Sequence, residues 1–167
     1  MRPVLTIYST NRRECAGVFT EKRSAMEVKF KKVTPDLMVL DVDKAVRFYT
    51  EKLGFKLDML VLENEQAIET SLVDGKEYVY AMVSRGEVFV MFMRRDVYAE
   101  DVPPLKGVPI GASATFYFDV DDVHGLYGSF REKGVEIVKD LLTTWYGMTE
   151  FYIRDQDGYI LGFAQRA

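Results

Sequence analysis

The chain has 167 residues, of which 48% are apolar and 29% charged, a composition typical of a folded protein with its own core rather than a disordered one. No apolar run approaches the about 20 residues that a membrane-spanning helix needs, so we expect no membrane association. The net charge is −4, and a basic segment at residues 1–25 leaves an acidic remainder, which disfavours a nucleic-acid partner. A single cysteine, Cys15, cannot form an internal disulfide, which favours a reducing, cytoplasmic location.

Residues 1–25 differ from the rest of the chain, because they lack a sustained hydrophobic period. The segment from Met26 onward has the character of a natural start, so residues 1–25 are interpreted as an N-terminal extension, either disordered or upstream of the true start. The alternative is that the apolar run at residues 4–8 adds a strand to the edge of a sheet, since short apolar runs are ambiguous by pattern alone.

A first group of elements follows in residues 26–95. The alternation and turn signals predict strands at 30–40, 55–63, 78–84 and 87–93, a helix at 44–53, and an ambiguous segment at 68–73 that is either a loop or the start of the third strand. Asp41 or Asp43 is the expected helix cap, and Gly54 is expected to end the helix. Residues 96–110 contain three prolines and a glycine and are predicted to be a linker.

The same order of elements recurs in residues 111–167. Strands are predicted at 112–120, 135–140, 150–154 and 159–164, a helix at 123–133, and a loop at 141–148. The recurrence is visible in the letters, because 41–57 (DVDKAVRFYTEKLGFKL) and 121–137 (DDVHGLYGSFREKGVEI) align without a gap and each has a glycine where its helix ends. Each unit therefore reads β-α-β-β-β, and two copies of one small sheet can enclose a cavity between them.

Three segments resemble the vicinal-oxygen-chelate superfamily, which includes glyoxalases, extradiol dioxygenases and bleomycin-resistance proteins. They are 34–55 (TPDLMVLDVDKAVRFYTEKLGF), 116–137 (FYFDVDDVHGLYGSFREKGVEI) and 146–165 (YGMTEFYIRDQDGYILGFAQ). The resemblance implies an α+β fold of two βαβββ modules whose paired, curled mixed sheets form a cup around a ligand. Because many members dimerise, it also implies a homodimer, and the cup could form within one chain or between two.

The enzymes of that superfamily hold a metal at four positions, usually through His, Glu or Gln. In this chain the resemblance places those positions at Thr34, at Val90 or Met91, at Ala114 or Thr115, and at Gly162. None of these side chains is a suitable ligand for a divalent metal. The only histidine, His124, lies on the predicted second helix, on a face expected to meet solvent. We therefore expect neither a metal nor another cofactor, and no catalytic residue is assigned.

Strand alternation, phased on those four positions, predicts which side chains line the cup. The candidate ligand-binding residues are Asp36, Met38, Tyr80, Met91, Tyr117, Trp145, Glu150 and Tyr152. Tyr78 and Met82 share the predicted inward phase of Tyr80. Asp36 and Glu150 are the carboxylates expected to meet a cationic ligand, although either could be solvated or paired with Arg154. Trp145 is either a stacking lid at the rim or a residue covering the core or a dimer interface.

The departure from the enzyme pattern indicates the branch that resembles bleomycin-resistance proteins. We expect a non-catalytic protein that binds a drug-like or toxin-like small molecule, either aromatic or cationic, because the predicted wall is aromatic and rich in methionine. One alternative is an enzyme of the same superfamily with an atypical or absent metal site. Another is a structural partner whose cup is filled by its own side chains or by another chain.

Overall fold

The computed structural model describes residues 29–63, 67–111 and 113–167, and Val33–Ala167 forms one compact unit. The predictions made for residues 1–25, including a strand at 4–8, lie outside the described residues. Within Val33–Ala167 the architecture is α+β with two βαβββ modules, as the sequence predicts.

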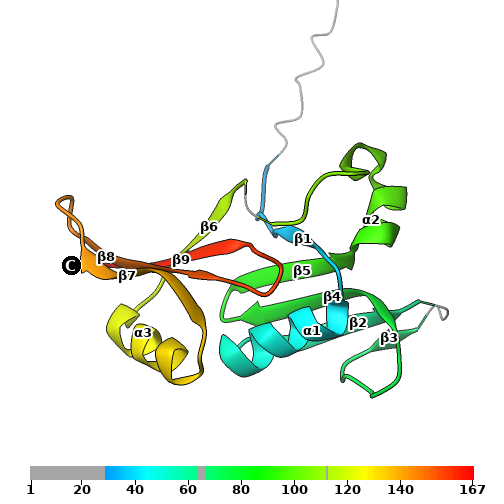
Figure 1. The fold of residues 1–167 in the computed structure, drawn as a ribbon, viewed down its shortest axis with the longest axis horizontal. Coiled ribbons are helices and arrows are strands. Elements are labelled where there is room, and N and C mark those ends of the chain that lie inside the picture. The colour runs from blue at the N-terminus through cyan, green and yellow to red at the C-terminus, as the bar shows by residue number, and fades with distance from the viewer. Residues whose placement is uncertain (1–28, 64–66, 112) are drawn as a thin grey trace, which may run out of the picture. The chain divides into compact units, whose positions relative to one another are not determined.

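The first module forms a five-stranded sheet, sheet A, in the order β1-β5-β4-β2-β3 (Figure 1). Its strands are β1 Asp36–Val39, β2 Lys56–Leu62, β3 Ile68–Glu69, β4 Tyr78–Arg85 and β5 Val88–Arg94. Strand β1 runs parallel to β5, while β2, β3, β4 and β5 pair antiparallel. The two-residue β3 settles the ambiguous segment at 68–73, since only its first residues pair with β2.

The second module forms a four-stranded sheet, sheet B, in the order β6-β9-β8-β7. Its strands are β6 Thr115–Asp119, β7 Glu136–Thr143, β8 Met148–Arg154 and β9 Ile160–Arg166. Strand β6 runs parallel to β9, as β1 does to β5, so the two sheets repeat one topology. Strands β7 and β8 extend further than predicted and reduce the expected loop at 141–148 to a hairpin tip at 144–147.

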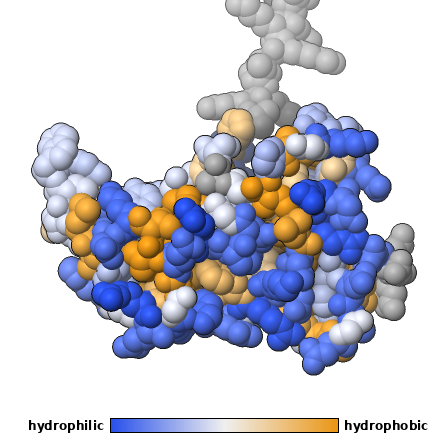
Figure 2. Space-filling view, viewed as in Figure 1, coloured by the Kyte–Doolittle hydropathy of each residue, from blue (hydrophilic) through white to orange (hydrophobic). Residues whose placement is uncertain are grey.

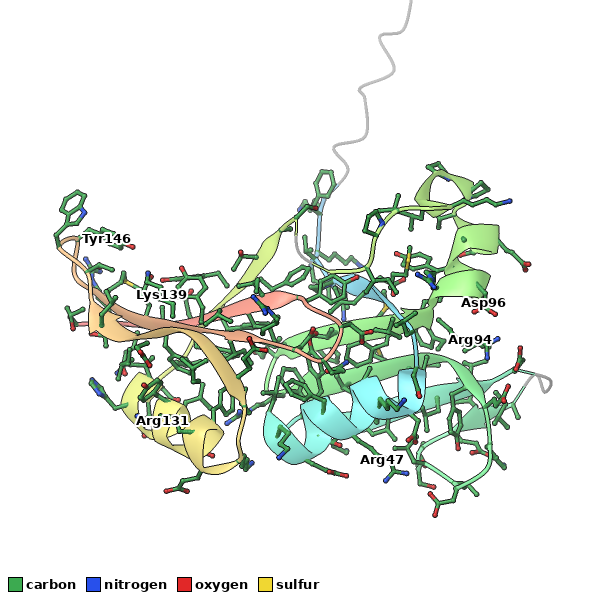
Figure 3. The ribbon with its side chains drawn as sticks, viewed as in Figure 1. Arg47, Arg94, Asp96, Arg131, Lys139 and Tyr146 are labelled. Atoms are coloured by element: carbon green, nitrogen blue, oxygen red, sulfur yellow. The ribbon has the colours of Figure 1, made fainter. Side chains whose placement is uncertain are left out.

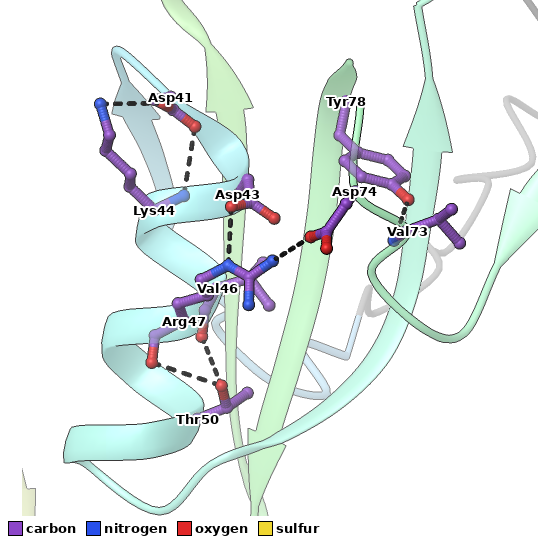
Figure 4. A network of polar contacts seen from close by, with 9 residues as sticks. All are labelled: Asp41, Asp43, Lys44, Val46, Arg47, Thr50, Val73, Asp74 and Tyr78. Carbon is purple, nitrogen blue, oxygen red and sulfur yellow. Dashed lines mark hydrogen bonds and ion pairs between the residues drawn. The ribbon is translucent and has the colours of Figure 1, made fainter. Parts of the chain in front are cut away.

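Each module has one helix between its first two strands, and an aspartate caps both. Helix α1 (Val42–Arg47) continues into a π-helical turn (Phe48–Lys52), and the carboxylate of Asp41 accepts the backbone N–H of Lys44 (Figure 4). Helix α3 (Val123–Glu132) is capped by Asp122, whose carboxylate accepts the backbone N–H of Gly125.

The caps show that the two copies are offset by one residue within their helices. One more residue lies between Asp41 and Gly54 than between Asp122 and Gly134. Both glycines have the positive φ that ends a helix. The π-helical turn accommodates the additional residue of the first copy. Asp122, rather than Asp121, is therefore the counterpart of Asp41, which assigns the third metal-equivalent position to Thr115 rather than Ala114.

The core lies between the helices and one face of each sheet. Tyr49 of the π-helical turn packs edge-on against Phe92 of β5, with ring centroids 4.7 Å apart. Phe130 of α3 packs against Phe151 of β8 and Phe163 of β9 in the same manner. Helices α1 and α3 lie on the same side of the two sheets, which leaves the opposite side of the sheets for other contacts (Figure 1).

One helix within the predicted linker was missed. Helix α2 (Arg95–Asp101) continues directly from β5, and a 3-10 turn (Pro103–Leu105) follows it. The prolines and Gly107 suggested an irregular segment, but the helix ends before the first of them. Helix α2 lies on the side of sheet A that faces away from α1 (Figure 1).

Polar contacts join the two modules. The Tyr49 hydroxyl donates to the Asp155 carboxylate at 3.0 Å, and the Tyr159 hydroxyl donates to the Met38 carbonyl at 3.0 Å. The same Asp155 carboxylate accepts the backbone N–H groups of Asp157 and Tyr159, which shapes the turn between β8 and β9. That turn is thereby fixed against the first module.

On the face seen in Figure 2, apolar patches alternate with hydrophilic residues. Among the residues that the structure describes, no helix is both long and apolar enough to cross a membrane.

Candidate functional site

The face of sheet A opposite α1 carries most of the chain's methionines. Strand register aligns two cross-strand rows there, Met59–Met82–Met91–Asp36 and Val61–Tyr80–Met93–Met38. We call these eight residues the methionine face. Residues that alternate with them, such as Leu60, Ala81 and Phe92, are buried in the core, which shows that the rows lie on the other side of the sheet. Five of the chain's eight methionines therefore share one surface.

Asp36 ends the first row and has no cationic partner among the residues that the structure describes. Its Oδ1 atom is buried without a hydrogen-bond partner, and no ion pair in the described part of the chain includes this residue. Burial raises the pKa of the Asp36 carboxyl; a hydrogen bond from Tyr98 of α2 opposes this shift, and the charge of Asp101 adds to it. The Tyr98 hydroxyl also lies 3.5 Å from the Asp36 carbonyl oxygen.

Two phenol groups are close enough to Asp36 to sense its charge. Burial raises the pKa of Tyr80 and of Tyr98, and the negative charge of Asp36 raises both further. Tyr80 stands in the neighbouring row of the sheet, whereas Tyr98 comes from α2. Tyr98 is therefore the phenol beside Asp36, while Tyr80 stands two strands away on the same face and responds to its charge.

The corresponding face of sheet B is built around a buried carboxylate that is fully paired. Glu150 is only 2% exposed, and its carboxylate accepts hydrogen bonds from the Lys139 ammonium and the Tyr117 hydroxyl, both at 2.7 Å. The Lys139 Nζ also lies 4.8 Å from the centroid of the Tyr152 ring. With Gly162, these residues form what we call the tyrosine face. In Figure 3, Lys139 and Tyr146 lie on β7 and at the hairpin tip, apart from Arg131 on α3.

The protonation states of this cluster follow from its hydrogen bonds. Burial tends to raise the pKa of the Glu150 carboxyl, but the bonds from Lys139 and Tyr117 outweigh it and hold the pKa below its usual range. Burial and the neighbouring carboxylate raise the pKa of Tyr117 well above that of a free phenol. At neutral pH the cluster therefore comprises a carboxylate, an ammonium and a neutral phenol.

Gly162 lies beneath two tyrosine rings of the tyrosine face. A Cβ atom at this position would lie 2.7 Å from Cε1 of Tyr152 and 3.0 Å from Cδ2 of Tyr117, closer than real Cβ contacts. The two ring centroids are 6.3 Å apart. Gly162 is the fourth metal-equivalent position, and the space that a ligating side chain would occupy there is filled by the two phenol rings.

The remaining metal-equivalent positions offer no better set of ligands. Val90 is buried in the core, so the second position belongs to Met91 on the methionine face. The set is then Thr34, Met91, Thr115 and Gly162, which supplies two hydroxyls, one thioether and no imidazole or carboxylate. No group of three or more His, Cys, Asp or Glu suited to a metal occurs among the described residues. The residues present do not fit the divalent metal of the superfamily's enzymes.

The structure divides the predicted site residues into two groups and sets one apart. Asp36, Met38, Tyr80 and Met91 lie together on the methionine face, and Tyr117, Glu150 and Tyr152 lie together on the tyrosine face. Trp145 is 95% exposed at the hairpin tip, and its ring meets Tyr146 edge-on at 5.4 Å. The alternative that Trp145 covers the core is therefore wrong.

Two further expectations need correction. Tyr78 does not share the phase of Tyr80, because a register shift between Val61 and Leu62 turns it into the core. Its hydroxyl accepts the backbone N–H of Val73 and donates to Glu69 (Figure 4 shows the Val73 contact). Glu150 is neither solvated nor paired with Arg154, which instead binds Glu136 at 3.1 Å.

Sequence reasoning also missed residues on both faces. Met59 and Met93 belong to the methionine face, and Lys139 is the cation of the tyrosine face. The alternation of β5 already placed Met93 in phase with Met91, so that signal was available. Lys139 was hidden by a bulge in β7, and Tyr98 by the unpredicted helix.

A groove of about 680 Å³ lies elsewhere, between the β4–β5 turn and α3. Apolar side chains such as Val88, Phe118 and Leu126 line it. Two of its charged residues already have structural roles, because Asp122 caps α3 and Arg85 donates to the Leu53 carbonyl at 2.6 Å. We therefore centre the candidate site on the methionine and tyrosine faces.

Two βαβββ modules in one chain, each with a helix between its first two strands, define a paired-module α+β fold. The model of the Glyoxalase/Bleomycin resistance protein/Dioxygenase superfamily matches residues 29–163, and the chain belongs to this superfamily. An uncharacterized protein, YraH from Bacillus subtilis (strain 168), is 31% identical over 103 residues, covering 60% of this chain and 70% of YraH.

Solved structures resemble the chain in fold. TioX from Micromonospora sp. ML1 has a TM-score of 0.58 at 20% identity, covering 83% of this chain and 100% of TioX. A glyoxalase/bleomycin resistance protein/dioxygenase from Nocardioides has a TM-score of 0.60 at 19% identity, covering 84% of this chain and 87% of that protein. At these identities the likeness concerns the fold alone.

Proposed function

We propose that this protein is a non-catalytic binding protein for a drug-like or toxin-like small molecule that is aromatic or cationic, comparable in role to bleomycin-resistance proteins. The observation that carries the proposal is Gly162, because the place of a metal ligand is taken by the rings of Tyr117 and Tyr152. A superfamily member that lacks the metal site retains a surface able to hold an organic ligand. Sequestration of the ligand would then be the biological effect.

The two faces support binding of an organic molecule. Thioether side chains adapt to irregular shapes, and phenol rings provide flat apolar area with a polar end. A mostly apolar wall with a few fixed polar groups is the usual character of a ligand site. The methionine face supplies the first, and the Lys139–Glu150 pair with its tyrosines supplies the second.

The second candidate is an enzyme of the same superfamily with an atypical metal site or none. It is favoured by the buried Glu150 cluster, since charged groups buried together are frequent in active sites. However, Glu150 is already neutralised by Lys139, and the Tyr117 hydroxyl is held protonated, so neither is poised as a base.

A thermal-shift screen against aromatic and cationic antibiotics tests the binding proposal. We expect at least one compound to raise the melting temperature, with saturable one-to-one binding that Tyr80→Ala weakens. Lys106→Ala, on an exposed residue after the 3-10 turn, is the matched control and should leave binding unchanged. No stabilisation by any compound counts against the proposal.

Elemental analysis separates the two candidates. The protein purified without chelators should contain no stoichiometric zinc, iron, nickel or manganese. A full equivalent of one of these metals, lost on substitution of Thr115 or Met91, would support the enzyme and overturn the argument from Gly162.

We also propose a homodimer. The hairpin tip supports it, because Trp145 and Tyr146 are both exposed aromatic residues next to exposed Leu142. Sedimentation analysis should give the mass of two chains, and Trp145→Ser with Tyr146→Ser should give the mass of one. A wild-type monomer at high concentration would contradict the proposal.

A further inference from the structure

We infer that the methionine face takes a lipophilic ammonium cation, a tertiary or quaternary amine with an apolar body, whose charged group sits at Asp36. The inference rests on the proposed function and deepens it by naming the class of ligand and the residue that recognises its charge. Three features of the described residues support it: an unpaired carboxylate, the aromatic groups beside it, and the thioether rows that lead away from it.

The first feature is the contrast between the two carboxylates that face the candidate site. Glu150 has Lys139 at 2.7 Å and a phenol at the same distance, so its charge is balanced within the protein. Asp36 has no ion pair in the described part of the chain, and its Oδ1 atom is buried without a partner. A buried carboxylate without a cation is costly, and a cationic ligand would remove that cost. The charge of Asp101 adds negative potential at the same place.

The second feature is the surroundings of Asp36. Tyr98 from α2 lies beside Asp36, with its hydroxyl 3.5 Å from the Asp36 carbonyl oxygen, and Tyr80 from β4 stands two strands away on the same face. Aromatic rings next to a carboxylate suit an alkylated ammonium, which is weakly hydrated and gains from contact with π faces. A strongly hydrated primary amine or a metal ion would gain less, because it gives up more water on entering.

The third feature is the direction and length of the rows. The row that ends at Asp36 continues through Met91 and Met82 to Met59, across four adjacent strands. Strands lie about 4.8 Å apart, so the row extends over roughly 14 Å. That length matches a body of two or three fused rings, and flexible thioethers would adjust to differently shaped bodies. The face should therefore discriminate by charge more strictly than by shape.

A pair of probes that differ only in charge tests the inference. The cation is (6-hydroxy-2-naphthyl)trimethylammonium, and its uncharged counterpart is 6-tert-butyl-2-naphthol. Titration calorimetry on the full chain should show the cation binding at least tenfold more tightly than the neutral compound. Asp36→Asn should abolish that preference by weakening the cation roughly tenfold, while binding of the neutral compound is unchanged, which also shows that the variant is folded.

Two more variants locate the binding surface. Met82→Ala should weaken both probes by a similar factor, because it removes contact with the apolar body. Glu136→Gln should leave the preference for the cation intact, because Glu136 is an exposed carboxylate already paired with Arg154. In addition, cation binding should release protons at acidic pH, because burial raises the pKa of Asp36 and a bound cation favours the ionised carboxyl. The release, measured in two buffers of different ionisation enthalpy, should disappear in Asp36→Asn.

The outcomes separate this inference from the function on which it rests. Equal binding of both probes, sensitive to Met82→Ala but not to Asp36→Asn, would overturn the inference and leave the binding function standing. A preference for the cation that persists in Asp36→Asn would overturn it as well. If neither probe binds, the inference fails, and the screen of antibiotics decides the proposed function independently.

Discussion

Lys52 and Lys133 each donate a hydrogen bond to the backbone carbonyl of the other. The Lys52 Nζ lies 2.5 Å from the Lys133 carbonyl oxygen, and the Lys133 Nζ lies 3.3 Å from that of Lys52. Both residues stand at the C-terminal end of their module's helix, at the same distance from the caps Asp41 and Asp122. The exchange therefore relates equivalent points of the two copies, as an approximate two-fold axis would.

The reciprocal contact should contribute to stability through both lysines. Helix C-termini carry partial negative charge, so each ammonium is favourably placed at the other helix. Lys52→Met and Lys133→Met should each lower the urea midpoint of unfolding, and the double variant should lower it further. Lys56→Met, at the exposed start of β2, is the control. Midpoints that match the control in both single variants would show that the contact contributes nothing.

Gly162 should tolerate no side chain. Gly162→Ala places a methyl group 2.7 Å from the Tyr152 ring, so the rings must shift and the free energy of unfolding should fall by about 1–3 kcal/mol. Gly128→Ala in α3, where nothing lies within 4 Å, should instead stabilise by about 0.5–1 kcal/mol. Denaturant unfolding measures both. Equal effects of the two substitutions would mean that the rings do not pack on Gly162.

Substitution of Glu150 should lower stability more than substitution of an exposed carboxylate of the same sheet. Glu150→Gln keeps the shape but removes the charge that Lys139 and Tyr117 bind, and we expect a loss of about 1–3 kcal/mol. Glu136→Gln breaks the exposed pair with Arg154 and should change stability by less than about 0.5 kcal/mol. Unfolding curves in urea compare the two variants, and a smaller loss for Glu150→Gln than for Glu136→Gln would be inconsistent with the buried pair.

Because of Asp155, the free energy of unfolding should depend on pH in the mildly acidic range. Burial raises its pKa to about 6, although the Tyr49 hydroxyl and the backbone N–H groups of Asp157 and Tyr159 oppose the shift. Because the folded-state pKa lies above the unfolded value of about 3.9, the protonated form stabilises the fold. That contribution, at most about 3 kcal/mol, is complete below pH about 4 and disappears as the pH rises through about 6.

The measurement for Asp155 is the difference in unfolding free energy between the wild type and Asp155→Asn across pH 4 to 7. The wild type should lose stability relative to the variant as the pH rises. Tyr49→Phe removes one of the donors that favour the carboxylate and should move the transition to higher pH. Parallel curves for wild type and variant would show that Asp155 titrates at an ordinary pKa.

The fold could be predicted because the sequence repeats one order of elements in its two halves. The aspartate caps, the glycines at 54 and 134 and the recurring strands gave the βαβββ order of both modules, and the structure confirms it. The π-helical turn could not be foreseen, because a single added residue leaves the apolar stripe of α1 intact. Helix α2 was not predicted, because it is short and immediately precedes Pro103 and Pro104, which dominate the local pattern.

The candidate site was predictable only where strands are regular. Period-two counting grouped Asp36, Met38 and Met91, whose strands pair without a shift. It failed at Tyr78 and at Lys139, where register shifts in the pairing of β2 with β4 and of β7 with β8 change which residue opposes the neighbouring strand. A bulge depends on the partner strand and leaves no mark in the periodicity of its own residues.

The position of Trp145 gives this protein an internal reporter. It is the chain's single tryptophan and is 95% exposed in the single chain, so the indole emission of the folded monomer should resemble that of a peptide in water. A shift to shorter wavelength on adding a compound, or on raising the protein concentration, would therefore signal that something has covered the hairpin. Quenching by iodide, compared before and after addition, would measure how completely it does so.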